Sequence, residues 1–161
     1  MVKFFVGIAI VAFTTYCGIF LSRKYKQRKT FFEEFYRFHF CVIEELNFTK
    51  RAYEDFYKKQ KYCGEFEMVL MAELERRKVR KALPISLDEY LFLTHEEKSF
   101  IAEYLATIGA GDSYSQKAYF TRAENRLQSL KTKAIEDCKK YVDLYIKMGF
   151  LFGLAILIVL I

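Results

Sequence analysis

Histidine and cysteine, which supply many catalytic nucleophiles and metal ligands, are scarce in this chain of 161 residues. There are two histidines, His39 and His95, and no two cysteines form a CxxC pair. His39 and Cys41 are two residues apart on an expected helix, so their side chains point to different faces. The sequence therefore predicts no metal site. Of the four cysteines, Cys17 lies inside a long apolar run, and the others are expected to be reduced, buried thiols; they are Cys41, Cys63 and Cys138.

The residue patterns of other catalytic sites are equally incomplete. A Ser/His/Asp arrangement could be drawn with His95, but no nucleophile elbow or strand context supports it. The segment Gly109-Ala110-Gly111 lacks the lysine of a phosphate-binding Walker motif. Adjacent carboxylates such as Glu44 and Glu45 diverge on a helix and cannot act as an acid–base couple. We therefore expect no enzyme activity, no cofactor and no small-molecule substrate. The alternative, a membrane-bound enzyme, would need a polar pocket among the helices.

Basic charge is concentrated near the start of the chain. Lys and Arg number 26, Asp and Glu number 20, and the net charge is +6. Residues 1–30 contain six basic residues and no acidic one, so residues 31–161 hold 20 of each and are neutral. This neutrality excludes nucleic acid as the expected partner of the body. A hydrophobic content of 53%, with one Pro and seven Gly, favours long helices over sandwiches and barrels.

Two apolar runs at the ends of the chain predict membrane-spanning helices. Phe4–Leu21 has eighteen residues without a charge, close to the length needed for a bilayer core of roughly 30 Å. The alternative, a cleaved signal peptide, is disfavoured because the basic cluster follows this run and no small-x-small cleavage site comes after it. Met148–Ile161 is fourteen residues long and needs residues 141–147 to complete a span. A buried core helix is the alternative here, but so small a chain has little with which to cover it.

Basic residues at one side of each apolar run predict the topology. The juxtamembrane basic residues are Arg23, Lys24, Lys26, Arg28, Lys29, Lys139 and Lys140. Because cytoplasmic flanks are enriched in Lys and Arg, both chain ends are expected on the far face and the body in the cytoplasm. The predicted organisation is an N-terminal transmembrane helix at residues 1–22, a cytoplasmic helical bundle domain at 23–140 and a C-terminal transmembrane helix at 141–161. The lipid bilayer is thus one predicted partner of a two-pass protein.

Apolar residues of the body recur at spacings of three and four, which predicts an all-α fold. We expect an antiparallel bundle of about six helices. The first continues from the N-terminal span through an aromatic stripe, the second covers Thr49–Lys61 and the third covers Glu65–Leu83. The stripe is interpreted as core, with a partner-binding surface as the alternative; its residues are Phe31, Phe35, Phe38, Val42 and Leu46.

Three capping boxes predict further helix starts. In a capping box, the N-cap hydroxyl accepts from the backbone amide of the N3 residue, and the N3 side chain accepts from the N-cap amide. The three boxes begin at Ser86, Thr94 and Ser113. The helix from Ser113 carries an apolar seam from Ala123 to Tyr141 that runs into the second span. The basic run Arg76–Lys81 is expected to be a solvated last turn, with contact to anionic headgroups or an acidic partner as the alternative.

A candidate loop and cap motif precedes the last helix. It comprises Gly109, Gly111, Asp112, Ser113 and Gln116. The glycines permit a tight reversal, the aspartate favours the positive helix N-terminus, and the last two side chains can satisfy free amides. The motif has either a structural role in the loop or a role as a partner contact.

Four short motifs occur in order along the chain. They are Glu45-Leu46-Asn47-Phe48, Leu93-Thr94, Ile108-Gly109-Ala110-Gly111-Asp112 followed by Gln116, and Lys139-Lys140-Tyr141 before Met148-Gly149. Together with a span at each end of a helical body, these motifs resemble the stage III sporulation protein AB family of endospore-forming bacteria. The resemblance covers essentially all 161 residues.

This resemblance implies a soluble domain similar to the F-type assembly platform protein of type II secretion and type IV pilus machines. It also implies a non-enzymatic scaffold subunit in the mother-cell membrane around the forespore, within the transenvelope channel that joins the two cells. A secretion-type ATPase and other channel subunits are the implied partners. A membrane scaffold of another secretion or pilus-like system is the alternative, and the neighbouring genes would distinguish the two.

Overall fold

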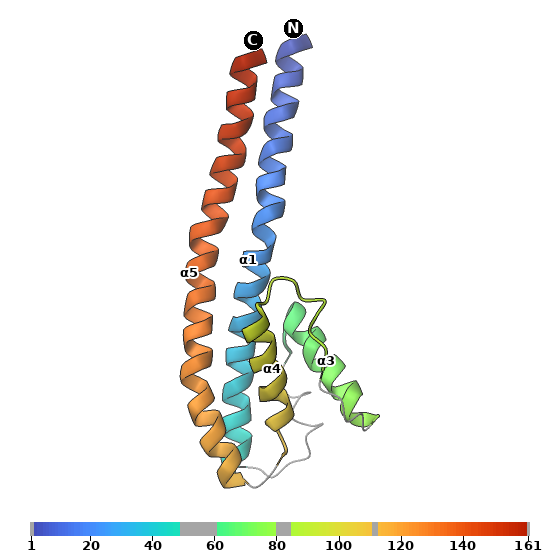
Figure 1. Cartoon of the computed structure of the whole chain (residues 1–161), viewed down its shortest axis with the longest axis vertical. Coiled ribbons are helices and arrows are strands. Elements are labelled where there is room, and N and C mark those ends of the chain that lie inside the picture. Colours follow the sequence, from blue (N-terminus) through green and yellow to red (C-terminus); the bar gives the residue numbers. More distant parts are fainter. Residues whose placement is uncertain (1, 49–60, 80–84, 111–112, 161) are drawn as a thin grey trace. The chain divides into compact units, whose positions relative to one another are not determined.

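A computed structural model of the chain describes residues 2–48, 61–79, 85–110 and 113–160. These residues contain four helices and no strand (Figure 1). The helices are α1 (Val2–Phe48), α3 (Glu65–Lys78), α4 (His95–Thr107) and α5 (Ser113–Leu160). The all-α prediction is confirmed, whereas the prediction of about six helices is not supported.

Two predicted helices account for the difference in number. The helix expected at Thr49–Lys61 falls on residues 49–60, which lie outside the described residues. The helix expected to start at Ser86 is wrong, because tight turns occupy this part of the chain. The amide of Tyr90 donates to the carbonyl of Leu87 (3.2 Å), and the amide of Leu93 donates to the carbonyl of Tyr90 (3.1 Å). These turns bury all three apolar side chains, which gives the segment a role in the core without a helix.

The chain divides into two compact units. Unit 1 comprises residues 1–26 and 133–161, and unit 2 comprises Gln27–Thr132. Helices α1 and α5 contribute residues to both units, while α3 and α4 belong to unit 2.

Unit 1 is an antiparallel pair of apolar helices, with the first residues of α1 beside the last residues of α5 (Figure 1). Helices α1 and α5 are each long and apolar enough to cross a membrane. Only 17% and 6% of their most apolar stretches is buried, whereas the core helix of a soluble protein would be mostly buried. The exposed apolar surface therefore favours the membrane reading over the core-helix alternative.

Glycines allow the two helices of unit 1 to approach closely. A Cβ added at Gly149 would lie 2.6 Å from the carbonyl oxygen of Thr14, and one at Gly18 would clash with the carbonyl oxygen of Tyr145. Gly153 lies one turn beyond Gly149, which makes a GxxxG pair on α5. This small-xxx-small spacing is typical of helix packing in membranes.

Unit 2 has a core of aromatic rings contributed by three helices. The stripe on α1 is buried as predicted, apart from Leu46, whose side chain lies outside the described residues. Phe35 of α1 stacks on Phe66 of α3, with ring centroids 5.3 Å apart, and packs edge-on against Tyr104 of α4 at 4.8 Å. The stripe is therefore core, and its reading as a partner-binding surface is wrong.

Helix α5 joins unit 2 through the predicted seam and two cationic side chains. Ala123 and Leu127 are buried on its inner face. At the edges of that face, the Arg126 guanidinium lies 4.5 Å from the centre of the Phe100 ring, and Lys131 Nζ lies 4.3 Å from the centre of the Tyr36 ring. Such cation–π contacts attach α5 to α4 and to α1.

Candidate functional site

The predicted loop and cap motif connects α4 to α5. Gly109 has a φ of 79°, the left-handed conformation that glycine adopts without strain. Its amide donates a hydrogen bond to Oε1 of Gln116 (3.2 Å), a buried side chain in the first turn of α5. Gly111 and Asp112 lie outside the described residues, and Ser113 begins α5 with its side chain outside them. The motif thus holds the end of α4 to the start of α5 through Gly109 and Gln116.

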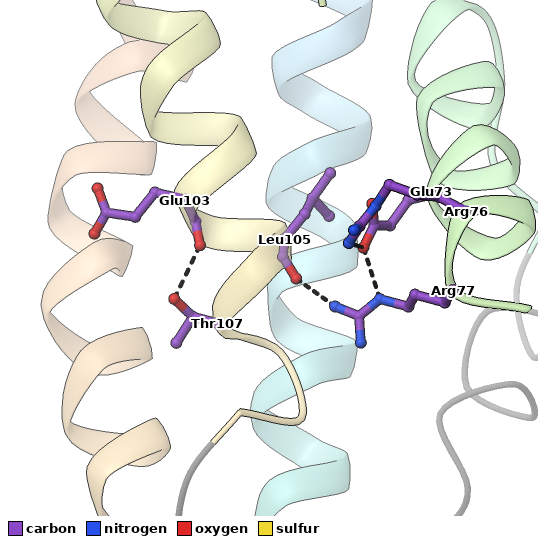
Figure 2. Close-up of polar contacts among 6 residues, drawn as sticks. All are labelled: Glu73, Arg76, Arg77, Glu103, Leu105 and Thr107. Carbon is purple, nitrogen blue, oxygen red and sulfur yellow. Dashed lines mark hydrogen bonds and ion pairs between the residues drawn. The ribbon is translucent and has the colours of Figure 1, made fainter. Parts of the chain in front are cut away.

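Two arginines of the predicted basic run at the end of α3 are partly buried in unit 2. Arg76 donates to both carboxylate oxygens of Glu73 (2.7 and 2.6 Å), and Nε of Arg77 donates to Oε1 of Glu73 (2.6 Å), as Figure 2 shows. The Glu73 side chain is only 1% exposed, and the two arginine side chains are 18% and 25% exposed. The prediction of a solvated last turn is therefore wrong for both arginines, because a buried carboxylate recruits them. Residues 80 and 81 of the run lie outside the described residues.

The pKa of Glu73 reflects two opposing effects. Burial of the carboxylate raises its pKa, because the charged form loses hydration. Hydrogen bonds and charge from Arg76 and Arg77 outweigh burial, so the pKa is lowered below its ordinary value. Glu73 is therefore ionised and paired in the folded unit.

Arg77 also reaches from α3 to the end of α4. Its Nη2 donates to the carbonyl oxygen of Leu105 (2.6 Å) near the end of α4, which also accepts from the amide of Ile108 (3.3 Å) (Figure 2). In the same turn, the Thr107 hydroxyl donates to the carbonyl of Glu103 (2.9 Å). The structure thereby brings together two features that are distant in sequence, the basic run and the loop motif. We call this set the α4-end cluster; its residues are Glu73, Arg77, Leu105, Gly109 and Gln116.

A second buried ion pair involves Arg28, one of the predicted juxtamembrane basic residues. Its Nη2 lies 2.6 Å from Oε1 of Glu97, and the two side chains are 11% and 5% exposed. Glu97 also completes the predicted capping box, because it accepts from the amide of Thr94 (2.9 Å) while its own amide donates to the Thr94 hydroxyl (3.3 Å). Arg28 therefore anchors the first turn of α4 within unit 2.

The remaining juxtamembrane basic residues differ in their surroundings. Lys29 belongs to unit 2 and lies 3.8 Å from Glu33. Five belong to unit 1 and are exposed: Arg23, Lys24, Lys26, Lys139 and Lys140. Tyr25 and Tyr141 stack beside them, with ring centroids 4.8 Å apart. Exposed cations with paired tyrosines are the composition of a membrane interface.

His39 is fully buried among the aromatic rings of unit 2. Its Nδ1 lies 2.9 Å from the hydroxyl of Tyr104, and its Nε2 has no hydrogen-bond partner among the residues described. Burial lowers the pKa of His39 to about 4, so the imidazole is neutral at physiological pH. No group of three His, Cys, Asp or Glu residues that could hold a metal ion occurs in the described part of the chain.

Sequence reasoning missed three of these features. Glu73 lies three and four residues before Arg76 and Arg77, a spacing that indicates ion pairs on a helix and is visible in the sequence. The GxxxG pair of Gly149 and Gly153 was also visible in the apolar run. The pair of Arg28 with Glu97 spans 69 residues, and no local pattern indicates it.

The family model of stage III sporulation protein AB matches residues 3–161, essentially the whole chain. The resemblance based on the four motifs is thereby confirmed. No curated protein and no solved structure gives a significant match.

Proposed function

Because the chain belongs to the stage III sporulation protein AB family, we propose that it is a non-enzymatic, membrane-anchored scaffold subunit of the channel between mother cell and forespore. Membership makes it a sporulation-related protein. The match over residues 3–161 carries the proposal, since it includes both apolar ends and the whole helical body.

The composition of unit 1 supports an anchor in the mother-cell membrane around the forespore. Its two helices expose apolar side chains along their length, and four exposed lysines and Arg23 lie near the stacked pair of Tyr25 and Tyr141. Lys and Arg favour the cytoplasmic side of a bilayer. These features support our proposal that the body lies in the cytoplasm and both chain ends lie on the far face.

The polar interior of unit 2 supports a scaffold more than a catalyst. Glu73 and Glu97 are buried, and each is held by arginine at hydrogen-bond distance. The α4-end cluster uses its polar atoms to join α3, α4 and α5. Groups committed in this way stabilise helix packing and are not directed at a reacting molecule.

A secretion-type ATPase is the proposed partner of unit 2, with other channel subunits in the same complex. Affinity purification of the tagged chain from sporulating cells tests this directly. We expect the ATPase and ring-forming membrane proteins of the sporulation channel in the eluate. Recovery of the components of a different secretion or pilus-like system would instead support the alternative scaffold.

Cysteine labelling in whole cells tests the proposed topology. Leu91 is 90% exposed in unit 2, so a cysteine at this position should react readily with any thiol reagent that reaches it. In vegetative cells that express the chain in the plasma membrane, with its native cysteines replaced by alanine, Leu91→Cys should resist a membrane-impermeant maleimide while the cells are intact and react after permeabilisation. Labelling in intact cells would place unit 2 outside and overturn the topology.

A further inference from the structure

We propose that unit 1 forms a parallel homodimer in the membrane, in which the groove between its two helices receives α1 of a second copy. This inference rests on the proposed membrane anchoring. It concerns a surface beside the glycine contact that joins α1 to α5 within one copy.

The groove is apolar and lies along one side of the helix pair, with a volume of about 570 Å³. Its lining residues come from both helices: Ile8, Val11, Ala12, Thr15, Tyr16 and Ile19 from α1, and Phe150, Leu154 and Leu157 from α5. Several of these side chains are well exposed, including Ile8 at 49% and Phe150 at 48%. Within a membrane, such a surface is covered either by lipid or by another helix.

The spacing of the lining residues is that of a helix-packing seam. On α1, four of them recur at steps of 4, 3 and 4, namely Ile8, Ala12, Thr15 and Ile19. On α5, Phe150, Leu154 and Leu157 recur at steps of 4 and 3. Residues at these steps form the seam that packs into a neighbouring helix. At about 100° per residue, the α1 seam lies roughly 100° around the helix from Thr14 and Gly18, which contact α5. The seam is therefore available to a further helix.

Two hydroxyl groups in the groove distinguish a helix from a lipid chain. The Thr15 hydroxyl donates to the carbonyl of Val11 (2.8 Å), so its lone pairs remain able to accept. Tyr16 is 64% exposed, and its hydroxyl makes no hydrogen bond with any residue that the structure describes. Its side chain leans toward the N-terminus of α1 and therefore away from the basic flank at Arg23. An unsatisfied hydroxyl in hydrocarbon is costly, and a lipid tail offers it no acceptor.

A second copy supplies the missing partner by symmetry. A two-fold axis along the membrane normal keeps each residue at the same depth in both copies. Thr15 and Tyr16 differ in depth by about 1.5 Å, so the Tyr16 hydroxyl of each copy can donate to Thr15 of the other. The arrangement gives two equivalent hydrogen bonds. Ala12 lies between these hydrogen bonds and the N-terminal end of the groove. Its small side chain permits close approach of the two α1 helices.

Disulfide cross-linking of the full chain tests this dimer. The chain, with its native cysteines replaced by alanine, is reconstituted alone into phosphatidylcholine vesicles and oxidised with copper phenanthroline. Ala12→Cys should give a disulfide-linked dimer. Phe13→Cys is the matched control, because it lies at nearly the same depth, is 67% exposed and faces away from the groove. Equal cross-linking at the two positions, or monomer at both, would overturn the proposal.

Energy transfer between labelled copies tests the hydroxyl pair separately. Tyr16→Phe keeps the ring and removes the donor from both copies, so we expect dimerisation to weaken about ninefold, about threefold for each of the two interhelical hydrogen bonds. Phe13→Leu should leave dimerisation unchanged, and equal affinity of Tyr16→Phe and wild type would refute the hydroxyl pairing. Extraction of the wild-type chain by alkaline carbonate would overturn the membrane anchor itself. A chain that resists extraction yet stays monomeric would overturn only the dimer.

Discussion

His39 should make the stability of unit 2 depend on pH between neutrality and pH 4. The imidazole is fully buried, and among the residues that the structure describes only its Nδ1 has a hydrogen-bond partner, the hydroxyl of Tyr104 at 2.9 Å. Burial lowers the pKa of His39 to about 4, whereas a histidine in an unfolded chain titrates near 6.5. The folded unit therefore disfavours the proton that the unfolded chain readily binds.

The direction and size of the effect follow from this difference in pKa. Above about pH 6.5 both states are neutral at His39, and its contribution to stability is complete. As the pH falls from 6.5 toward 4, the unfolded chain gains the proton first, so the free energy of unfolding decreases. With about 1.4 kcal/mol for each unit of pKa difference, the loss amounts to about 2 kcal/mol at pH 5 and about 3 kcal/mol at pH 4.

Urea denaturation of the full chain in a mild detergent measures this loss. The chain has 12 tyrosines and no tryptophan, so the near-ultraviolet circular dichroism of tyrosine reports tertiary packing. For a urea dependence of about 1–3 kcal/mol per molar, the midpoint should fall by about 1 M between pH 7 and pH 5. His39→Asn is the matched control, since its amide retains a polar group near Nδ1 but does not titrate. Equal midpoint shifts for the variant and the wild type would refute the reasoning.

Three further perturbations test contacts within each unit. Arg28→Met should destabilise unit 2 by about 3 kcal/mol in the same denaturation assay, because it leaves the buried Glu97 carboxylate without its cation. Adding Glu97→Gln should restore part of the lost stability, because the glutamine is uncharged and can still accept from the Thr94 amide. No restoration would contradict the ion-pair account. Gly149→Val should lower the melting temperature of the chain in detergent more than Gly149→Ala, since a Cβ there would lie 2.6 Å from a main-chain oxygen of α1; unchanged melting would contradict the close approach. Gln116→Ala should lower the melting temperature by a few degrees, because the Gly109 amide loses its acceptor; Gln116→Glu is the control that keeps this acceptor. If the Gln116→Ala chain folds but no longer recovers the ATPase in affinity purification, this loop is a partner contact.

Periodicity and helix caps account for the parts of the fold that were predicted correctly. Apolar spacing located α1, α4 and α5, because one buried face recurs every three or four residues. The Thr94 box and Gly109 placed the ends of α4, since both signals act within a single turn. The same signal failed at Ser86, where burial of Leu87, Tyr90 and Leu93 favours successive turns over a helix. Local signals are therefore reliable only where tertiary packing agrees with them.

The candidate site was harder to predict than the fold, because its contacts join distant segments. The loop motif was recognised from Gly109 and Gln116, which are seven residues apart. The contact of Arg77 with the Leu105 carbonyl spans 28 residues, and charge patterning alone assigned Arg77 to solvent. Its true environment depends on which helix lies beside α3, and single-sequence reasoning has no access to that information.

The packing of α3 has a consequence for how unit 2 opens. Helix α3 is 14 residues long, and a helix of that length is marginal in water without tertiary support. Phe66 provides much of that support by touching Phe31, Phe35 and Phe38 of α1. Separation of α3 from α1 would expose these rings at once, so the two segments belong to one cooperative unit. Their backbone amides should exchange with solvent deuterium at closely similar rates, through a shared opening and not by independent fraying.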